Sequence, residues 1–340
     1  MTEPAPRRPP LSVLDLALVN AGATSAQAFA ATTALARRAE ELGYQRFWVA
    51  EHHNMASVAS TSPPVLMAHL AASTQRIRIG SGGIMLPNHP PLVVAEQVAA
   101  LEALHPGRID LGIGRAPGTD QHTAAALRRT AEGLGAEDFP RDLLDLMGLL
   151  GDVRTDRGLW QHFRATPVSA TTPLIALLGS SGYSAQLAGA LGLPFAFAHH
   201  FDMGGTLHAM QLYRDAFRAG PTLERPHAIV TANVLVAPTD AEAEWEAASG
   251  RVMVHGIRTG RFEPLLHPDE ANAHPALPVA RAMPSNRVVG SPATALARLD
   301  DLLGESGADE LMVSTVAFDL EVRCRSLDLL TQAWESDPAA

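Results

Sequence analysis

Lysine is absent from this sequence of 340 residues, and all 26 basic residues are arginines. Without a lysine amine, neither Schiff-base catalysis nor a lysine-dependent phosphate loop is available. Cysteine occurs once, at Cys324, which excludes an intrachain disulfide framework and a cysteine-based zinc site. The formal net charge is −10, which argues against nucleic acid as the main partner.

Long apolar runs are missing as well. No run reaches the ~20 residues that a membrane-spanning helix needs. The first residues, MTEPAPRRPP, lack the apolar core of a secretory signal. With the single cysteine, these features predict a cytoplasmic protein without a membrane partner. A chain of this length buries about three-quarters of its unfolded surface, which suffices for one large domain or two smaller ones.

Short β-rich runs alternate with helical patterns along most of the chain, which is typical of a parallel sheet crossed by helices. About eight such units occur without a break long enough to be an interdomain linker, so the sequence predicts an α/β fold, a closed (β/α)8 TIM barrel. Residues 1–340 are expected to form one domain with a flexible N-terminus at 1–10. The expected strands are 11–19, 45–50, 76–85, 108–113, 174–178, 195–198, 228–237 and 310–315.

The segment 256–292 is rich in proline and shows little periodicity. A long segment without regular structure in a compact domain is usually a functional loop or disordered. Because loops that follow strands surround the active face of a barrel, we expect an insertion that forms an active-site lid here. A surface insertion without a role is the alternative.

Two histidines, His52 and His53, directly follow the second expected strand. Side chains alternate along a strand, so one ring can face the barrel mouth while the other packs or bonds locally. This argues against a paired metal site and makes both histidines catalytic candidates. Structural histidines at a strand end are the alternative. His199 and His200 close the sixth expected strand, where they either line the same mouth or only end the strand.

Glycines and an arginine follow the third and fourth expected strands. Gly82 and Gly83 would let a large flat ligand approach the backbone, whereas a β-bulge is the structural alternative. The run from Gly112 to Gly118 is similar to a dinucleotide fingerprint, but it has proline in place of the last glycine and follows the wrong strand. Arg115 in this run is better explained as an anion clamp, with a surface arginine as the alternative.

The fifth expected strand runs straight into a helix through Gly179, Ser180, Ser181 and Tyr183. Free main-chain N–H groups at a helix N-terminus bind anions, most often phosphate. A serine N-cap without a ligand is the alternative. All these motifs fall at strand ends, where barrel enzymes build their sites. Together they supply phosphate donors, a flat glycine wall and an imidazole, as a phosphorylated planar cofactor requires.

Four ordered segments resemble the bacterial luciferase-like flavin-dependent monooxygenases: residues 43–54, 76–91, 106–120 and 177–184, with a continuation at 307–313. The resemblance implies a (β/α)8 barrel with an insertion and a homodimer formed through the early helices. It also implies reduced FMN as cofactor, supplied by a separate NAD(P)H:flavin reductase, and O2 as co-substrate.

The resemblance assigns roles to individual residues. His52 matches the catalytic histidine, with His53 beside it. Gly82-Gly83 matches a non-prolyl cis peptide against the flavin ring, and Arg115 matches the arginine that holds the flavin phosphate. Gly179, Ser180 and Tyr183 match the phosphate loop, and Ser181 lies within it. Many relatives carry a second phosphate arginine where this chain has Ala125. Arg128, one turn later, is a candidate substitute for it.

The implied activity is transfer of one oxygen atom from O2 to a small organic substrate through a flavin C4a-hydroperoxide. His52 is expected to pass a proton during this reaction, and a closing loop would keep water away. Arginine-rich and alanine-rich usage indicates secondary metabolism, such as antibiotic biosynthesis, with epoxidation or hydroxylation of an aromatic or polyketide compound. F420-dependent hydride transfer, oxidation of long-chain aldehydes and non-enzymatic flavin binding are the alternatives.

Overall fold

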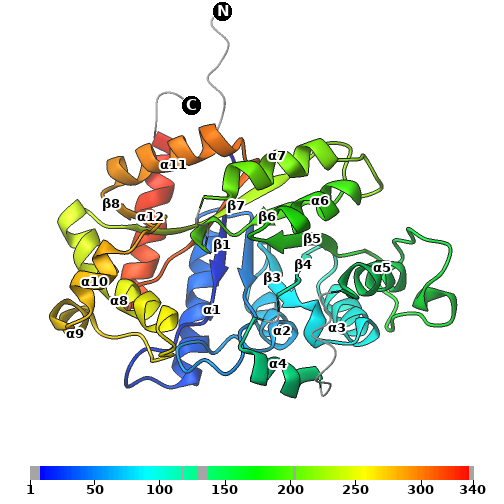
Figure 1. Ribbon diagram of the computed structural model, residues 1–340, viewed down its shortest axis with the longest axis horizontal. Coiled ribbons are helices and arrows are strands. Elements are labelled where there is room, and N and C mark those ends of the chain that lie inside the picture. Colours follow the sequence, from blue (N-terminus) through cyan, green and yellow to red (C-terminus); the bar gives the residue numbers. More distant parts are fainter. Residues whose placement is uncertain (1–7, 117, 129–136, 202–203, 337–340) are drawn as a thin grey trace, which may run out of the picture.

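A closed barrel of parallel strands forms the centre of the molecule, with helices around it (Figure 1). The computed structural model describes residues 8–116, 118–128, 137–201 and 204–336. Around the barrel the strand order is β1-β2-β3-β4-β5-β6-β7-β9, and β9 pairs with β1 to close it. This confirms the predicted (β/α)8 barrel.

The strands are buried on both faces because side chains fill the barrel and helices cover its outside. Inside the barrel, the large ring of Trp48 lies among small side chains such as Ala176 and Ala196. The barrel strands are β1 (Leu11–Asp15), β2 (Arg46–Val49), β3 (Arg78–Met85), β4 (Ile109–Gly114), β5 (Leu174–Gly179), β6 (Phe195–Phe197), β7 (Ala228–Val236) and β9 (Glu310–Ser314).

Local signals define the helices. The first begins after Thr24, whose hydroxyl accepts a hydrogen bond from the main-chain N–H of Gln27 in a capping box. In the described part of the chain, no helix is both long and apolar enough to cross a membrane. In the described chain, the α-helices of eight or more residues are α1 (Ser25–Glu41), α2 (Pro63–Ser73), α3 (Pro91–Leu104), α4 (Gln121–Arg128), α5 (Phe139–Leu149), α6 (Gly182–Ala190), α7 (Thr206–Ala216), α8 (Asp240–Arg258), α11 (Pro292–Ser306) and α12 (Leu320–Ser336).

The first strand is shorter than predicted, because β1 ends at Asp15. The apolar run continues to Val19, but Leu16 and Leu18 line cavities at the barrel mouth instead of extending the sheet. An isolated bridge between Leu18 and Val58 ties this segment down. The apolar pattern therefore predicted correctly that this segment is buried, but it is buried at the barrel mouth and not in a strand.

The segment 256–292 has more regular structure than expected. It contains α9 (Pro268–Ala273), α10 (Leu277–Ala282) and β8 (Val288–Gly290), which pairs with the end of β7. The expectation of a segment without regular structure is therefore wrong. Both helices are six residues long and begin with proline in the first turn, so they are too short to show a helical period in the sequence.

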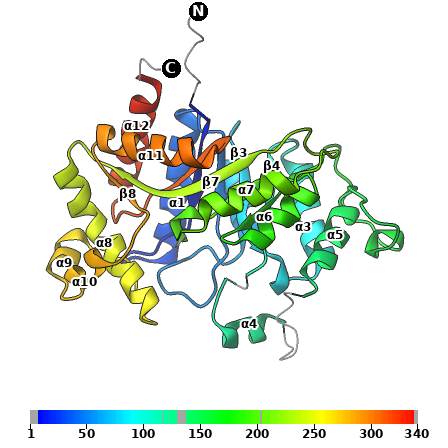
Figure 2. The ribbon, with the colours of Figure 1, turned by 45° about the horizontal axis from the view of Figure 1, so that its top comes forward.

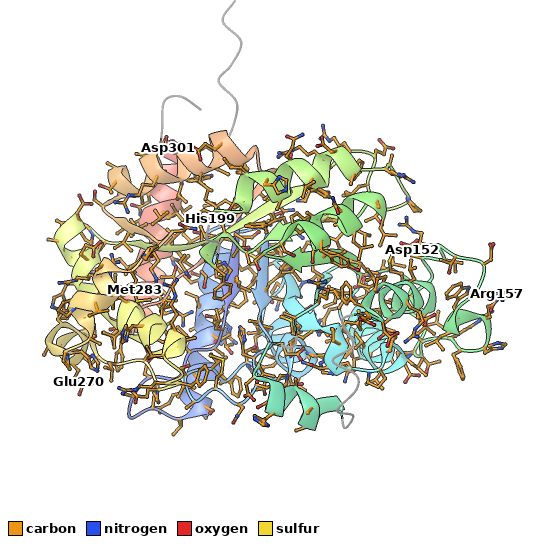
Figure 3. All side chains as sticks on the ribbon, viewed as in Figure 1. Asp152, Arg157, His199, Glu270, Met283 and Asp301 are labelled. Atoms are coloured by element: carbon orange, nitrogen blue, oxygen red, sulfur yellow. The ribbon has the colours of Figure 1, made fainter. Side chains whose placement is uncertain are left out.

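The helices outside the main ring occupy distinct positions (Figures 1 and 2). In both views α8, α9 and α10 lie together on one side of the barrel, α5 lies on the other side, and α4 lies apart from the ring. Asp152 and Arg157, in the segment that follows α5, lie at the periphery, whereas His199 lies near the centre (Figure 3). None of the described residues that line the barrel mouth comes from 152–172.

A buried ion cluster stabilises the opposite end of the barrel, where the strands begin. The guanidinium of Arg46 lies 2.9 Å from Asp110 and 2.8 Å from Glu310. Both carboxylates are 0% exposed. The indole N–H of Trp48 also donates to Asp110. The cluster therefore joins β2, β4 and β9 inside the barrel.

We expect Arg46→Met to lower the free energy of unfolding by about 3–5 kcal/mol, because buried Glu310 loses its arginine and buried Asp110 keeps only the cation of Arg78. Urea denaturation followed by circular dichroism measures this loss. Arg38→Met, which removes partly exposed ion pairs with Glu41 and Asp328, is the control and should cost less than about 1 kcal/mol. A loss at Arg46 no larger than the loss at Arg38 would contradict a stabilising role for the cluster.

The same cluster predicts how stability depends on acid. Burial by itself would raise the pKa of Glu310, but the hydrogen bond with His227 and the charge of Arg46 outweigh it and lower this pKa. A carboxylate with a lowered folded-state pKa adds stability that is present above its unfolded pKa and is lost as the pH falls toward the folded value. We therefore expect the free energy of unfolding to decrease when the pH is lowered past about 4.3. In Glu310→Gln this decrease should be less steep.

Candidate active site

Two adjoining cavities open at the C-terminal ends of the barrel strands. The first, which we call the groove, has a volume of about 260 Å³ and lies over β2 to β6. The second, which we call the chamber, has a volume of about 270 Å³ and lies toward β1, β7, β9 and α8. The two cavities share the lining residues Leu16, His52, Gly118, His200 and Phe201, so they form one continuous space.

His52 stands where the groove meets the chamber. Its main-chain N–H donates to the carbonyl of Ser60 at 3.0 Å, and its Nδ1 lies 3.2 Å from the carbonyl oxygen of Gly118. A carbonyl only accepts, so Nδ1 carries the proton and Nε2 is left as the proton acceptor. Burial lowers the pKa of His52 more than the Gly118 hydrogen bond and the Glu51 charge raise it. The imidazole is therefore neutral near neutral pH.

His53 has a different environment. Its Nε2 lies 2.8 Å from Glu51, a carboxylate that is 0% exposed. Glu51 also contacts His89 at 2.9 Å and accepts a hydrogen bond from the main-chain N–H of Met85. His53 lines only the chamber and, through Glu51, ties the end of β2 to the end of β3. Sequence reasoning did not single out Glu51, although a carboxylate directly before a histidine pair was the available signal.

The backbone itself forms one wall of the groove. The peptide between Gly82 and Gly83 is cis, as the resemblance implied. A Cβ atom on Gly82 would lie 2.5 Å from Leu14 Cδ1, and one on Gly83 would lie 2.8 Å from the carbonyl oxygen of Gly112. A side chain at either position would therefore displace its neighbours, and glycine leaves a flat surface for a ligand.

A guanidinium and a helix N-terminus lie at the far end of the groove. The guanidinium of Arg115 lies 4.3 Å from the centre of the Tyr183 ring. Ser180 and Ser181 line the groove at the start of α6, and the N-cap Ser181 makes no side-chain cap. The first N–H groups of α6 thus remain available to a ligand oxygen, and the helix dipole favours a negative charge there.

The structure separates the predicted residues into groups. Tyr183 lies outside the groove, where its ring supports Arg115. Arg128 is the last residue of α4, but its side chain lies outside the described part of the chain. Ser184 lines the groove and was missed, although it belongs to the predicted loop. The predicted residues that line the groove are His52, Gly82, Gly83, Arg115, Gly179, Ser180 and Ser181.

His200 is a second histidine at the junction of groove and chamber. Its Nδ1 lies 3.2 Å from the carbonyl oxygen of Thr231. Burial lowers the pKa of His200 to about 4, and the nearby His199, Arg287 and His52 act in the same direction. Its ring is therefore neutral as well. His199 lies apart, with Nδ1 2.7 Å from the hydroxyl of Thr206.

The chamber walls are mainly apolar, and they come from distant parts of the chain. Three of its residues, Ile257, Phe262 and Arg287, lie in the segment 256–292. No local sequence pattern predicts that these residues line a cavity, because they come together only in the folded barrel. The apolar lining includes Leu16, Leu18, Met55, Val58, Met253, Ile257 and Val316.

The donors around the groove fit a flavin mononucleotide. A guanidinium and a free helix N-terminus suit its phosphate, and the glycine wall suits the flat ring. The neutral His52 lies on the side where the groove opens into the chamber. The groove thus has the groups that a planar, anionic cofactor would need, and the chamber is a separate space beside it.

Comparison with known proteins agrees with this geometry. The family described as luciferase-like monooxygenase matches residues 10–310. A luciferase-like monooxygenase of Escherichia coli K12 is 43% identical over 323 residues, which cover 94% of this chain and 95% of that protein. The N-acetyl-S-alkylcysteine monooxygenase of Bacillus subtilis is 40% identical over 253 residues, 74% of this chain and 75% of that protein. The crystal structure of apo-MsnO8 shares 38% identity and a TM-score of 0.88, covering 97% of this chain and 100% of that one. This chain is therefore an enzyme that belongs to the luciferase-like monooxygenase family.

Proposed function

We propose that the enzyme uses reduced FMN and O2 to insert one oxygen atom into a small organic substrate. One observation carries the proposal. The groove joins an anion site, a glycine wall and a neutral histidine, and it opens directly into an apolar chamber. Membership of the family supports the class of reaction.

Each part of the site has a task in this proposal. Reduced FMN, when bound, supplies the electrons that activate O2. Arg115 and the N-terminus of α6 hold the phosphate, and Gly82 and Gly83 support the ring. His52 Nε2 accepts or returns a proton beside the ring. The apolar chamber positions the substrate and excludes water from the reacting atoms.

The phosphate end of the groove also bears on how the flavin arrives. Arg115 supplies the guanidinium among the described groove residues. On α4 this chain has Ala125, where the resemblance to the family implies a second phosphate-binding arginine. We therefore propose reversible binding of FMN that a separate NAD(P)H:flavin reductase has reduced. A weakly held flavin can exchange between two proteins, whereas a tightly held one would have to be reduced in place.

Titration with reduced FMN and reduced F420 under anaerobic conditions tests the cofactor. Trp48 packs behind Gly82, so its fluorescence should report a flavin in the groove. We expect reduced FMN to quench this fluorescence at lower concentration than F420. Exposure of the FMN complex to O2 with substrate should then give an oxygenated product. Tighter binding of F420, or tight binding of oxidised FMN without any product, would favour the alternative functions.

Three substrate classes are worth comparing in that assay. The name of the Bacillus subtilis relative points to N-acetylated thioethers. The composition of the sequence favours an aromatic or polyketide metabolite of antibiotic biosynthesis, and an apolar chamber would also accept a long-chain aldehyde. We place the thioethers first because that relative shares 40% identity over most of this chain.

The segment 256–292 is proposed to act as a lid. Phe262 and Arg287 from this segment line the chamber, while α9 and α10 pack on α8. A lid in this place would cover the substrate and leave the phosphate end of the groove free.

The helices α2 and α3 support a homodimer. Val65 on α2 is 70% exposed and Leu104 on α3 is 68% exposed. An apolar depression between α1 and α2 lies beside Val65. Exposed apolar residues that adjoin such a depression are typical of an interface, so we propose that two copies pair through this face.

We expect Val65→Asp to raise the dissociation constant of the dimer by about 10- to 100-fold, because a charge would be buried in an apolar contact. Analytical ultracentrifugation over a range of concentrations measures the change. Val168→Asp, at a position that is 81% exposed in the peripheral segment, is the matched control and should not alter assembly. A wild-type monomer, or an equal effect of both variants, would refute this interface.

A further inference from the structure

Arg287 directly precedes β8, and its side chain lines the chamber. Its Nη2 donates to the carbonyl of Gly250 in the middle of α8, at 3.1 Å. A Cβ atom on Gly250 would lie 2.5 Å from Arg287 Nη1. Glycine is unfavourable inside a helix, and here it leaves room for the guanidinium against the helix backbone.

Arg287 carries a charge that none of the described acidic residues pairs with. Within the described residues it forms no ion pair. Burial lowers the pKa of Arg287 to about 10, and the positive charges of Arg251 and Arg258 act in the same direction. Arg287 is thus protonated near neutral pH, and Arg251 is itself paired with Glu244 at 2.8 Å.

The other titratable groups around the chamber do not neutralise this charge. His52 and His200 have lowered pKa values and are neutral. His53 is paired with Glu51. The carboxylate of Asp120 also lines the chamber, but it forms no ion pair with Arg287; it accepts hydrogen bonds from Thr123 and from the main-chain N–H of His122 at the start of α4.

Other polar groups face the same cavity. Ser57 lines the chamber, and its buried hydroxyl has no hydrogen-bond partner among the described residues. Asn233 and Ser314 also line it, side by side in register on β7 and β9. The remaining walls are apolar. The chamber therefore combines an apolar space with hydrogen-bonding groups and one uncompensated cation.

Arg287 is half-buried beside an apolar space, and a cation that is partly removed from water without an ion-pair partner is costly unless a ligand supplies the opposite charge. We infer that the substrate is an organic acid whose apolar body fills the chamber and whose carboxylate pairs with Arg287. The inference rests on the proposed function, because it takes the chamber as the substrate site. The flavin phosphate is a poor match for Arg287, since this arginine does not line the groove.

Matched pairs of a carboxylic acid and its primary amide test the inference. We would titrate phenylacetate, decanoate and N-acetyl-S-benzylcysteine, each with its amide, into the enzyme with and without oxidised FMN, by calorimetry. In at least one pair the acid should bind about 10- to 100-fold more tightly than the amide, as a charge-assisted hydrogen bond predicts. Equal binding of acid and amide in all three pairs by the wild-type enzyme would overturn the inference without any variant.

Three variants locate the source of the preference. Arg287→Gln should reduce it to less than about threefold, and Arg287→Lys should retain part of it. Arg258→Gln removes an exposed arginine nearby and should keep the full preference. An acid preference that survives in Arg287→Gln would also overturn the inference.

The affinity for FMN, measured separately, distinguishes this inference from the proposed function. Arg287→Gln should bind FMN as the wild type does. If the wild-type protein failed to bind FMN but still bound the acids through Arg287, the cofactor proposal would be wrong while the acid site stood. Loss of FMN affinity in Arg287→Gln would instead place the flavin phosphate at this arginine and overturn the inference.

Discussion

Replacement of His52 by glutamine should lower kcat for substrate oxygenation by about 100- to 10,000-fold, the usual range for loss of an acid–base group. Glutamine is close to histidine in size and keeps a polar amide at this position, but it cannot accept and return a proton. Binding of reduced FMN should change little. Oxygen uptake should continue, but without a matching amount of oxygenated product.

Comparison of oxygen consumed with product formed measures this coupling. The exposed His208 on α7 offers a control, and His208→Gln should behave as the wild type. Because burial lowers the pKa of His52, the wild-type rate should be constant around neutral pH. It should decrease only in more acidic solution, where Nε2 becomes protonated. Full coupled turnover by His52→Gln would show that the assignment is wrong.

Arg115→Met should weaken the binding of FMN by about 10- to 100-fold, because the phosphate loses a charge-assisted hydrogen bond. Methionine keeps much of the side-chain volume and removes the charge. Tyr183→Leu should have a smaller effect of about threefold, since it removes only the aromatic ring on which the guanidinium is stacked. Fluorescence titration gives both dissociation constants.

Riboflavin provides the critical control, because it has the same ring system without the phosphate. Its affinity should be the same in the wild type and in Arg115→Met. The exposed Arg225 serves as a matched arginine, and Arg225→Met should leave FMN binding unchanged. Equal weakening of FMN and riboflavin by Arg115→Met would mean that Arg115 supports the structure of the groove and not the phosphate.

The barrel was predictable because each β/α unit carries local information. Alternation of apolar runs with helical patterns predicts parallel strands, and eight such units close into a cylinder. Strand boundaries were less predictable. Leu16 and Leu18 are apolar because they line the mouth, and an apolar residue looks the same in a sequence whether a strand or a cavity buries it.

The strand-end motifs of the candidate site were predictable for a topological reason. In a parallel barrel every strand ends on the same face, so His52, Gly82, Arg115 and Ser180 were expected to meet there. All four line the groove. The partner that each side chain contacts was not predictable from the motifs. The attachment of His53 to Glu51 and the stacking of Arg115 on Tyr183 involve side-chain directions that residue spacing does not specify.

The sequence by itself therefore determined the class of fold, the family and the groups at the phosphate end of the groove, since these depend on short motifs within single β/α units. Only the tertiary structure decided what forms the chamber. Leu18, Val58, Met253, Arg287 and Val316 come from five separate segments, and none is close to another before the barrel closes. The role of Arg287 likewise depends on the tertiary structure, because only the packed chamber shows that none of the described carboxylates pairs with this arginine.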